Sequence, residues 1–191
     1  MNTRWLIALA LVLAFSAMFA HTAKAENPAN VEIGAWLVNV EKVDLASNSY
    51  RLDFYLWFRF NSTEVSLENM KDFEFINGAP SKDLIYATED YLEYRVRGDF
   101  IKTFDFARYP FETHKLAVEL EHKNLNASYL HFTTDTSSNI DETANVAGWN
   151  IGSFETLVVD HSYGDDAYSR FVFSVSQLDL HFHHSSRVSY Q

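Results

Sequence analysis

Alternation of apolar and polar side chains is the dominant pattern along the chain. Between Ser49 and Asn61, every second residue is apolar, and the positions between them are mostly charged or amphipathic. The apolar set is Leu52, Phe54, Leu56, Phe58 and Phe60, and the other set is Arg51, Asp53, Tyr55, Trp57 and Arg59. Because successive side chains of a strand point to opposite sides of a sheet, this pattern predicts a half-buried β-strand.

The same alternation recurs further along the chain. Leu92–Val96 and Leu116–Leu120 repeat it, and Phe100, Phe104 and Phe106 share one face of the segment between them. Further strand candidates are Val31–Val43, Phe73–Ile76, Tyr129–Thr133, Trp149–Val159 and Tyr168–Leu178. Turn-forming clusters separate the strands at Asp44–Ser49, Asn77–Pro80, Asn124–Asn126 and Tyr163–Asp166. About ten strands, with one short helical turn within Glu64–Asp72, predict an all-β antiparallel sandwich or barrel.

One irregularity is expected near the end of the last strand. Phe171, Phe173 and Val175 place the apolar face on odd positions, whereas Leu178 and Leu180 place it on even positions. A shift of one residue turns the side chains to the other side of a sheet. The sequence therefore predicts a β-bulge or a strand end near Gln177.

The first 25 residues, 1–25, have the organisation of a secretory signal peptide. Arg4 supplies a positive start, Leu6–Ala20 is apolar except for Ser16, and Ala23-Lys24-Ala25 matches a cleavage site. The apolar stretch is shorter than the roughly 20 residues that a membrane-spanning helix requires. We therefore expect an exported chain in which residues 26–191 form one domain, with no transmembrane domain.

The net charge and the absence of cysteine limit the classes of partner that the protein can bind and the cellular compartment in which it is expected. The chain has 15 Lys and Arg against 26 Asp and Glu, a formal charge of −11, and no cysteine. The acidic balance excludes a nucleic-acid partner, which needs a basic surface. Export without cysteine favours a bacterial periplasm. Because removal of Arg4 and Lys24 leaves a still more acidic chain with seven of its eight histidines, we expect self-association to be stronger near pH 5 than near pH 8.

Two sets of residues are candidates for metal binding. His181, His183 and His184 carry imidazoles that suit zinc, copper or nickel, but they lie close to the chain end, which favours a solvated tail. Asp135, Asp141 and Glu142 could hold calcium but lack the spacing of an EF-hand loop, which favours a solvated loop. No metal site and no cofactor are expected.

Catalysis has less support in the sequence than binding. The chain has no Gly-x-Ser-x-Gly turn and no distinctive pair of acidic residues, so we do not expect an enzyme. Tyr55 and Trp57 lie on the polar face of a strand, and Tyr163 and Tyr168 flank a Gly-Asp-Asp turn. Such rings either hold a cationic or amphiphilic small ligand, or cover the sheet and contact a neighbouring subunit.

Two motifs resemble one protein family. The segment Phe104–Leu116, with Tyr109-Pro110-Phe111-Glu112 at its centre, resembles the conserved loop of pentameric ligand-gated ion channels, and Gly148–Phe154 is similar to the strand that enters the last hairpin of their extracellular domain. Val31–Val43 and Tyr50–Phe60 resemble the first two strands of that domain, and Phe73–Asn77 the next segment. Bacterial members of the family lack the cysteines of the animal receptors, as this chain does.

The resemblance implies a twisted antiparallel β-sandwich of about ten strands that assembles as a pentamer. Agonists of the family bind between subunits, under the loop that joins the last two strands. By position, Tyr163 and Tyr168 would lie on this capping loop, Glu121–Ser128 would form the middle binding loop, and Tyr55 would lie on the complementary face. The coupling face towards the membrane would hold Asp44, Tyr109, Pro110, Phe111 and Glu112.

The function expected from these observations is that of a periplasmic or extracellular ligand-binding domain of a pentameric ligand-gated ion channel. The domain would be free-standing or truncated before the membrane helices, and would bind a small ligand or protons at the interfaces of a homo-oligomer. It would contact a membrane only through a missing or separate pore domain. The alternative is an exported carbohydrate- or metal-binding β-sandwich protein.

Overall fold

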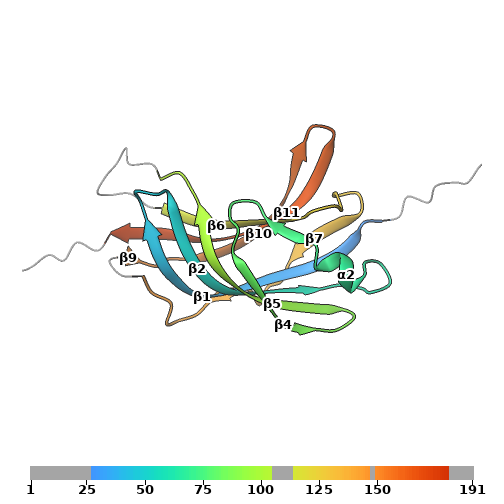
Figure 1. The fold of residues 1–191 in the computed structure, drawn as a ribbon, viewed down its shortest axis with the longest axis horizontal. Coiled ribbons are helices and arrows are strands. Elements are labelled where there is room, and N and C mark those ends of the chain that lie inside the picture. Colours follow the sequence, from blue (N-terminus) through green and yellow to red (C-terminus); the bar gives the residue numbers. More distant parts are fainter. Residues whose placement is uncertain (1–26, 105–113, 147–148, 181–191) are drawn as a thin grey trace, which may run out of the picture.

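A computed structural model of the protein describes residues 27–104, 114–146 and 149–180, without the side chains of 149–150 and 176–180 (Figure 1). Within this part of the chain, two β-sheets pack face to face, and the predicted all-β sandwich is confirmed at that level. One short helix, α2 (Leu67–Met70), begins after Ser66, whose Oγ accepts the Asn69 amide proton over 3.3 Å. This helix confirms the predicted helical turn.

The first sheet has the strand order β4-β5-β2-β1-β7, with β8 also paired to β1. Its strands are β1 (Ala29–Asp44), β2 (Ser49–Arg59), β4 (Ser81–Ala87), β5 (Tyr91–Ile101), β7 (Leu130–Thr134) and β8 (Asn139–Ile140). The long strands pair antiparallel, but β7 and β8 run parallel to β1. The expectation of a purely antiparallel sandwich is therefore wrong for these two short strands.

The second sheet has the order β10-β11-β6-β3, and β9 pairs with the end of β11. Its strands are β3 (Phe73–Phe75), β6 (His114–His122), β9 (Trp149–Asn150), β10 (Phe154–Tyr163) and β11 (Asp166–Leu180). Pairing of β11 with β6 shifts register between Val175 and Leu178, which confirms the irregularity predicted near Gln177. The predicted strand Trp149–Val159 is in fact divided, because residues 151–153 leave the ladder.

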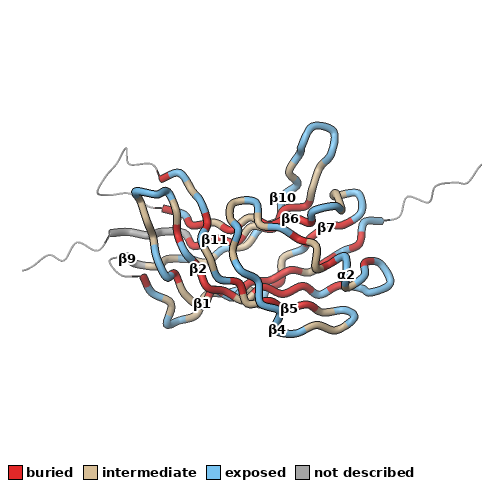
Figure 2. Tube along the Cα trace, in the orientation of Figure 1, coloured by how far each residue is buried: buried red, intermediate tan, exposed pale blue. Residues whose placement is uncertain are grey.

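Phenylalanine rings contact one another across the core between the sheets, among valine, leucine and isoleucine side chains. Phe54 of β2 meets Phe173 of β11 with ring centroids 4.8 Å apart, and Phe58 of β2 meets Phe73 of β3 at 5.0 Å. The buried residues are concentrated along the central parts of the strands, and the hairpin tips and loops are exposed (Figure 2). The alternation in the sequence therefore identifies the core residues of β2, β5, β6 and β11 up to Val175 correctly.

The outer face of β2 is more covered than its polar residues suggest. Asp53 and Trp57 are 4% and 8% exposed, although the alternation places them on the polar side. The Arg95 and Arg97 side chains of β5 pair with Asp53 over 2.8 and 2.5 Å. Charged neighbours thus bury part of a sheet face that the sequence predicts to be open.

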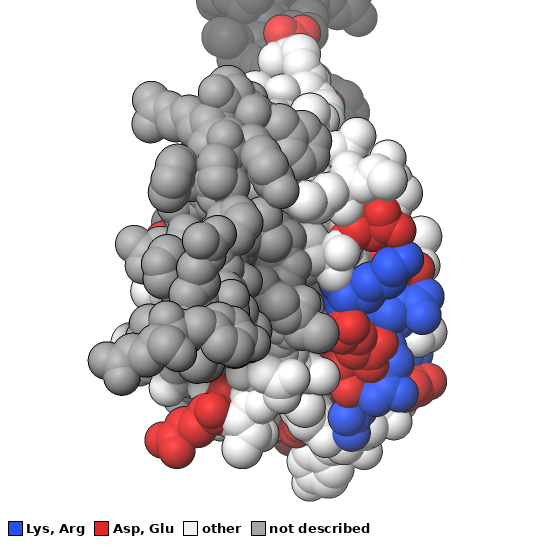
Figure 3. Space-filling view, turned by 90° about the vertical axis from the view of Figure 1, so that its left-hand side faces the viewer, with Lys and Arg blue, Asp and Glu red and all other residues white. Residues whose placement is uncertain are grey.

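The β1–β2 hairpin lies at one end of the sandwich, and Figure 3 shows acidic and basic side chains intermixed over one side of this end. Asp44 Oδ1 accepts the amide protons of Ala46 and Ser47, each over 3.1 Å, and so fixes the hairpin turn. The Phe104 amide donates to Asn48 Oδ1 over 3.2 Å, so this turn contacts the end of the described segment 27–104. Tyr109, Pro110, Phe111 and Glu112 of the expected coupling face, and Phe106, lie outside the described residues.

The β10–β11 hairpin projects from the second sheet, in the half of the sandwich away from the β1–β2 hairpin (Figure 1). Gly164 occupies the tight turn with a φ of 66°, in the left-handed region that glycine adopts without strain. This turn pairs Tyr163 directly with Asp166. No helix in the described part of the chain is long and apolar enough to cross a membrane.

Candidate ligand-binding site

A pocket of about 280 Å³ lies at the base of the β10–β11 hairpin. Strands β3 and β6 of the second sheet, the β10–β11 hairpin and the segment after β6 contribute to it. Its lining residues are Glu74, Glu121, His122, Lys123, Tyr163, Asp166 and Tyr168. We call this the hairpin-base pocket. It brings together the two tyrosines of the predicted capping loop and the beginning of the predicted middle binding loop.

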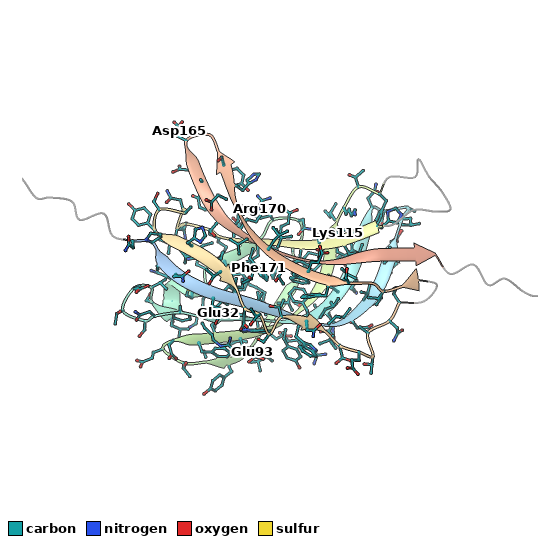
Figure 4. The ribbon with its side chains drawn as sticks, turned by 180° about the vertical axis from the view of Figure 1, so that it is seen from behind. Glu32, Glu93, Lys115, Asp165, Arg170 and Phe171 are labelled. Carbon is teal, nitrogen blue, oxygen red and sulfur yellow. The ribbon has the colours of Figure 1, made fainter. Side chains whose placement is uncertain are left out.

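Arg170 of β11 forms the charged floor beside this pocket. Its Nε donates to Glu121 Oε1 over 2.6 Å, one terminal nitrogen donates to Glu119 Oε2 over 2.5 Å, and the other donates to Tyr163 Oη over 2.9 Å. Figure 4 shows Arg170 at the base of the hairpin. Because Arg170 is 9% and Glu121 3% exposed, each charge needs the other to offset its desolvation.

The two tyrosines lie above this floor on adjacent strands. Their ring centroids are 5.9 Å apart and the planes meet at 73°, an edge-to-face arrangement. Tyr163 is 49% exposed, and Tyr168 is half-buried. Desolvation and then the Glu121 charge raise the pKa of Tyr163, so its hydroxyl is neutral at physiological pH. The pair offers ring surface next to fixed negative charge.

The segment after β6 is tied to the hairpin by two hydrogen bonds. Asn126 Nδ2 donates to Asp166 Oδ1 over 3.1 Å, and the Ala127 amide donates to the Ala167 carbonyl over 2.7 Å. The predicted middle loop and the predicted capping loop are therefore connected directly, beside the pocket that they line.

A second aromatic group lies on the outer side of the first sheet. This group lines a shallow pocket of about 330 Å³. The lining residues are Trp36, Tyr55, Trp57, Arg59, Tyr91 and Glu93. We call this the aromatic patch. Trp57 is packed so closely on the backbone that a Cβ added at Gly34 would lie 2.4 Å from its Cζ2 atom. The Arg95 guanidinium lies over the Tyr55 ring, 5.2 Å from its centroid.

The aromatic patch and the hairpin-base pocket lie on different sheets of the same chain. In Figure 4, Glu93 of the patch and Asp165 at the hairpin tip lie on opposite sides of the sandwich. One chain therefore does not bring Tyr55 together with Tyr163 and Tyr168. A ligand that contacts all three tyrosines has to lie between two copies of the chain.

The acidic residues considered for calcium have other roles. Asp135 is 4% exposed and accepts hydrogen bonds from Trp57 Nε1 over 2.7 Å and from Ser137 N over 2.8 Å, and it also pairs with Arg59. The expectation that it belongs to a solvated loop is therefore wrong. Asp141 accepts from the Thr143 amide over 2.8 Å. Among the described residues, no three His, Asp or Glu side chains are grouped to hold a metal, and His181–His184 lie outside them.

A larger hollow of about 880 Å³ lies along β5 and the Asn77–Pro80 turn. Both arginines of its lining form ion pairs within the chain. Arg51 pairs with Asp99 over 2.6 Å, and Arg97 pairs with Asp53 and Glu41 over 2.5 and 3.1 Å. Ile76 and Ile101 supply its apolar lining. The hollow therefore combines apolar surface with paired charges and offers no aromatic ring to a ligand.

Sequence reasoning missed several residues that shape these sites. Glu74, Glu119, Asp166 and Arg170 contribute to the hairpin-base pocket or its floor, and Trp36, Arg59, Tyr91 and Glu93 contribute to the patch. His122 lies within the predicted middle loop Glu121–Ser128, but the sequence did not single it out. Arg170 occupies a polar position beside the alternating apolar residues of its strand. This position is the one feature of the sequence that could have indicated a role for Arg170.

Comparison of the sequence with models of known protein families and with curated proteins finds no match. The function of this chain therefore has to be inferred from its own residues and from the geometry of its pockets.

Proposed function

We propose that this chain is the extracellular or periplasmic ligand-binding domain of a protein of the pentameric ligand-gated ion-channel type. It would bind a small organic cation between two copies of the chain. The domain would act either by itself or joined to a pore domain carried elsewhere, and its ring would be homo-pentameric. The observation that carries the proposal is the convergence of Tyr163, Tyr168 and Glu121 on the hairpin-base pocket.

The separation of Tyr55 from the other two tyrosines supports an interface site. The resemblance implies one half-site under the last hairpin and a complementary half-site on another face of the neighbouring subunit. The hairpin-base pocket and the aromatic patch are two such surfaces, on different sheets of one chain. Repetition of one chain around a ring brings unlike faces together at every interface.

The charge of the hairpin-base pocket supports a cationic ligand. Glu74, Glu121 and Asp166 contribute carboxylates to its lining, and Lys123 is the one cation among the described lining residues. Arg170 beneath the pocket pairs with both Glu119 and Glu121, so the floor keeps a net negative charge. Lys123 pairs with Asp72 over 3.0 Å. An ammonium group next to tyrosine faces and carboxylates gains cation–π and charge interactions together.

The binding test is calorimetric titration of the purified protein with primary and quaternary amines such as propylamine, choline and tetramethylammonium. We expect binding by at least one amine, a loss of affinity of about tenfold or more in Tyr168→Ala and in Tyr55→Ala, and no change in Tyr129→Ala. Tyr129 is 64% exposed and lines neither site. A protein that binds none of the amines and stays monomeric at every concentration would contradict the proposal.

One observation favours a second candidate, a carbohydrate-binding β-sandwich. The patch places Trp36 and Tyr55 beside Glu93 and Arg59, and flat rings with polar neighbours suit the C–H face of a sugar. In that case a glycan array would show binding that Trp36→Ala abolishes and Tyr168→Ala leaves intact. Amine binding with loss in both tyrosine variants would exclude this candidate as the main function.

A further inference from the structure

We propose that His122 is a proton-operated latch that holds the segment 123–127 against the β10–β11 hairpin when its imidazole is neutral and releases it when the imidazole is protonated. This inference rests on the proposed function, because it assigns a regulator to the same pocket. The regulated element is the connection between the middle segment and the tyrosine-bearing hairpin.

The hydrogen bonds of His122 define its neutral form. Nδ1 accepts two backbone amide protons, from Asn124 over 3.1 Å and from Leu125 over 2.9 Å. Nε2 lies 2.8 Å from the Asn69 carbonyl oxygen, which can only accept. The proton of the neutral ring is therefore on Nε2, and all the hydrogen-bonding capacity of the imidazole is used inside the protein.

Protonation removes the acceptor on which this arrangement depends. An imidazolium carries a proton on both nitrogens, so Nδ1 would point a donor at two other donors. Since His122 is 3% exposed, water cannot replace the lost partners without movement of the segment. A buried group left unsatisfied carries its full desolvation penalty, which favours an opened segment once the ring is charged.

The segment that His122 holds leads directly to the hairpin. Residues 124 and 125 are followed at once by Asn126 and Ala127, which hydrogen-bond to Asp166 and Ala167 at the start of β11. Tyr168 is the next residue along β11, and Tyr163 pairs with Asp166 across the turn. Release of the segment 123–127 therefore separates the side of the pocket that follows β6 from the side formed by the β10–β11 hairpin.

Charged groups lie around His122 on several neighbouring elements. Asp72 after α2 and Lys123 after β6 act on its charge directly. Glu74 of β3, Glu121 of β6 and Asp166 of β11 line the same pocket, and Lys82 of β4 lies near Asp72 and Lys123. Glu68 and Lys71 flank Asn69 in the sequence and pair with each other. Burial lowers the pKa of His122 below its usual value, and Lys123 acts in the same direction, whereas the Asn69 carbonyl and Asp72 oppose the shift.

The direction of the shift fixes the pH response. The unfolded chain takes up the proton near the ordinary histidine pKa of 6.5, before the folded chain does. The latch therefore contributes its full stability above about pH 6.5 and loses it progressively as the pH falls towards the folded-state pKa. Acidification weakens the connection between the segment and the hairpin.

The test is nuclear magnetic resonance of the purified protein between about pH 7.5 and pH 4.5, without any ligand. Imidazole ¹⁵N shifts report the tautomer and titration of His122, and amide exchange reports the segment, after correction for the intrinsic effect of pH. We expect an Nε2–H tautomer at the upper pH and a fall of about tenfold or more in the protection of the Asn124 and Leu125 amides on acidification. The amides of Ala127 and Ala167 should change with the same midpoint.

Two variants make the test specific. His122→Asn keeps an acceptor at the position of Nδ1 but cannot titrate, so the protection of the two amides should no longer depend on pH. His131→Asn is the matched control, because His131 is partly exposed and lies 3.5 Å from Asp160 instead; it should behave as the wild type does.

A protonated His122 at about pH 7.5, or a pH response that persists in His122→Asn, would overturn the proposal. If His122→Asn fails to fold, the titration of the wild-type protein still tests the proposal. Amide protection that changes with a midpoint different from that of the His122 imidazole would also overturn it. None of these readouts uses an amine. Failure of the latch therefore leaves the binding proposal standing, and failure of amine binding leaves the latch standing.

Discussion

The hairpin-base pocket and the aromatic patch are both built from aromatic and charged side chains, but they are held in different ways. In the patch the polar atoms of the rings are anchored: Trp57 donates to Asp135, the Tyr91 hydroxyl donates to Glu93 over 3.0 Å, and the Tyr55 hydroxyl accepts from Arg95 over 3.3 Å. These rings lie on β2 and β5, two long strands within the first sheet.

In the pocket, by contrast, the fixed part is the charged floor of Arg170, Glu119 and Glu121. The tyrosines lie on a hairpin that projects from the sandwich and whose turn is exposed (Figure 2). Elements with few buried contacts open at lower free energy than core strands. The patch is therefore a preformed surface, whereas the pocket can change shape around a rigid ionic base.

The largest effect should come from removing the base of the pocket. Arg170→Met leaves Glu121 buried without its partner, and we expect a loss of about 3–5 kcal/mol in the free energy of unfolding. Urea denaturation at neutral pH measures it. The double variant Arg170→Met/Glu121→Gln should recover a large part, because the buried charge is then gone. A loss below about 1 kcal/mol in the single variant would show that the floor is not the fixed part.

The next effect concerns the anchor of the patch. The Ser137 amide, the Trp57 N–H and the Arg59 charge together outweigh desolvation and lower the pKa of Asp135 to about 2, from 3.8. The stability from this carboxylate is present above pH 3.8 and is lost as the pH falls towards about 2. Asp135→Asn should therefore cost about 2 kcal/mol at neutral pH and much less near pH 2.

Denaturation curves of this variant at several pH values measure the effect, with Asp165→Asn at the exposed hairpin tip as the control. The control should match the wild type. An Asp135→Asn penalty that is the same at every pH would mean that the patch is anchored by packing and not by this charge.

A smaller effect is expected at the top of the pocket. Tyr163→Phe removes the acceptor for one Arg170 nitrogen at an exposed site, so the cost should be below about 1.5 kcal/mol. Hydrogen exchange should nevertheless become faster in β10 and the start of β11, and not in β2 or β5. If Tyr163→Phe lowered the free energy of unfolding as much as Arg170→Met does, the hairpin tyrosine would be held as rigidly as the charged floor, and the distinction between them would be wrong.

The smallest effect is the response of assembly to pH. Because the chain carries a formal charge of −11, protonation reduces repulsion between copies, and light scattering should show modestly stronger self-association near pH 5 than near pH 8. Comparison at low and high salt separates this from the latch, because screening weakens repulsion between exposed charges. Association that does not depend on pH at low salt would contradict the expectation.

Much of the fold could be predicted from the alternation of side chains, and the exceptions have physical reasons. Strand β4 was missed because Leu84, Ile85 and Tyr86 are consecutive apolar residues without alternation. The register shifts between Leu84 and Tyr86, and all three side chains are exposed on an edge strand. A pattern that depends on one buried and one exposed face carries no information about such a strand.

The candidate site could be predicted less well, because it depends on pairing between strands far apart in the sequence. Tyr55, Tyr163 and Tyr168 were found from their positions in the alternation and beside the turn. Arg170 meets Glu119 and Glu121 only because β11 pairs with β6 in one particular register, with Phe171 opposite Leu120. The role of His122 depends on two amides of the turn that follows it, which no spacing in the sequence reveals.

The central claim, a ligand site shared by two copies, is tested most directly by mixing subunits. Tyr55→Ala and Tyr168→Ala each damage one face, so neither variant alone should bind the amine with wild-type affinity. A co-assembled equal mixture would contain about a quarter of its interfaces with both faces intact. Calorimetry should then recover about a quarter of the wild-type sites at wild-type affinity. A mixture that recovers no binding, although the subunits co-assemble, would contradict a site between copies of this chain.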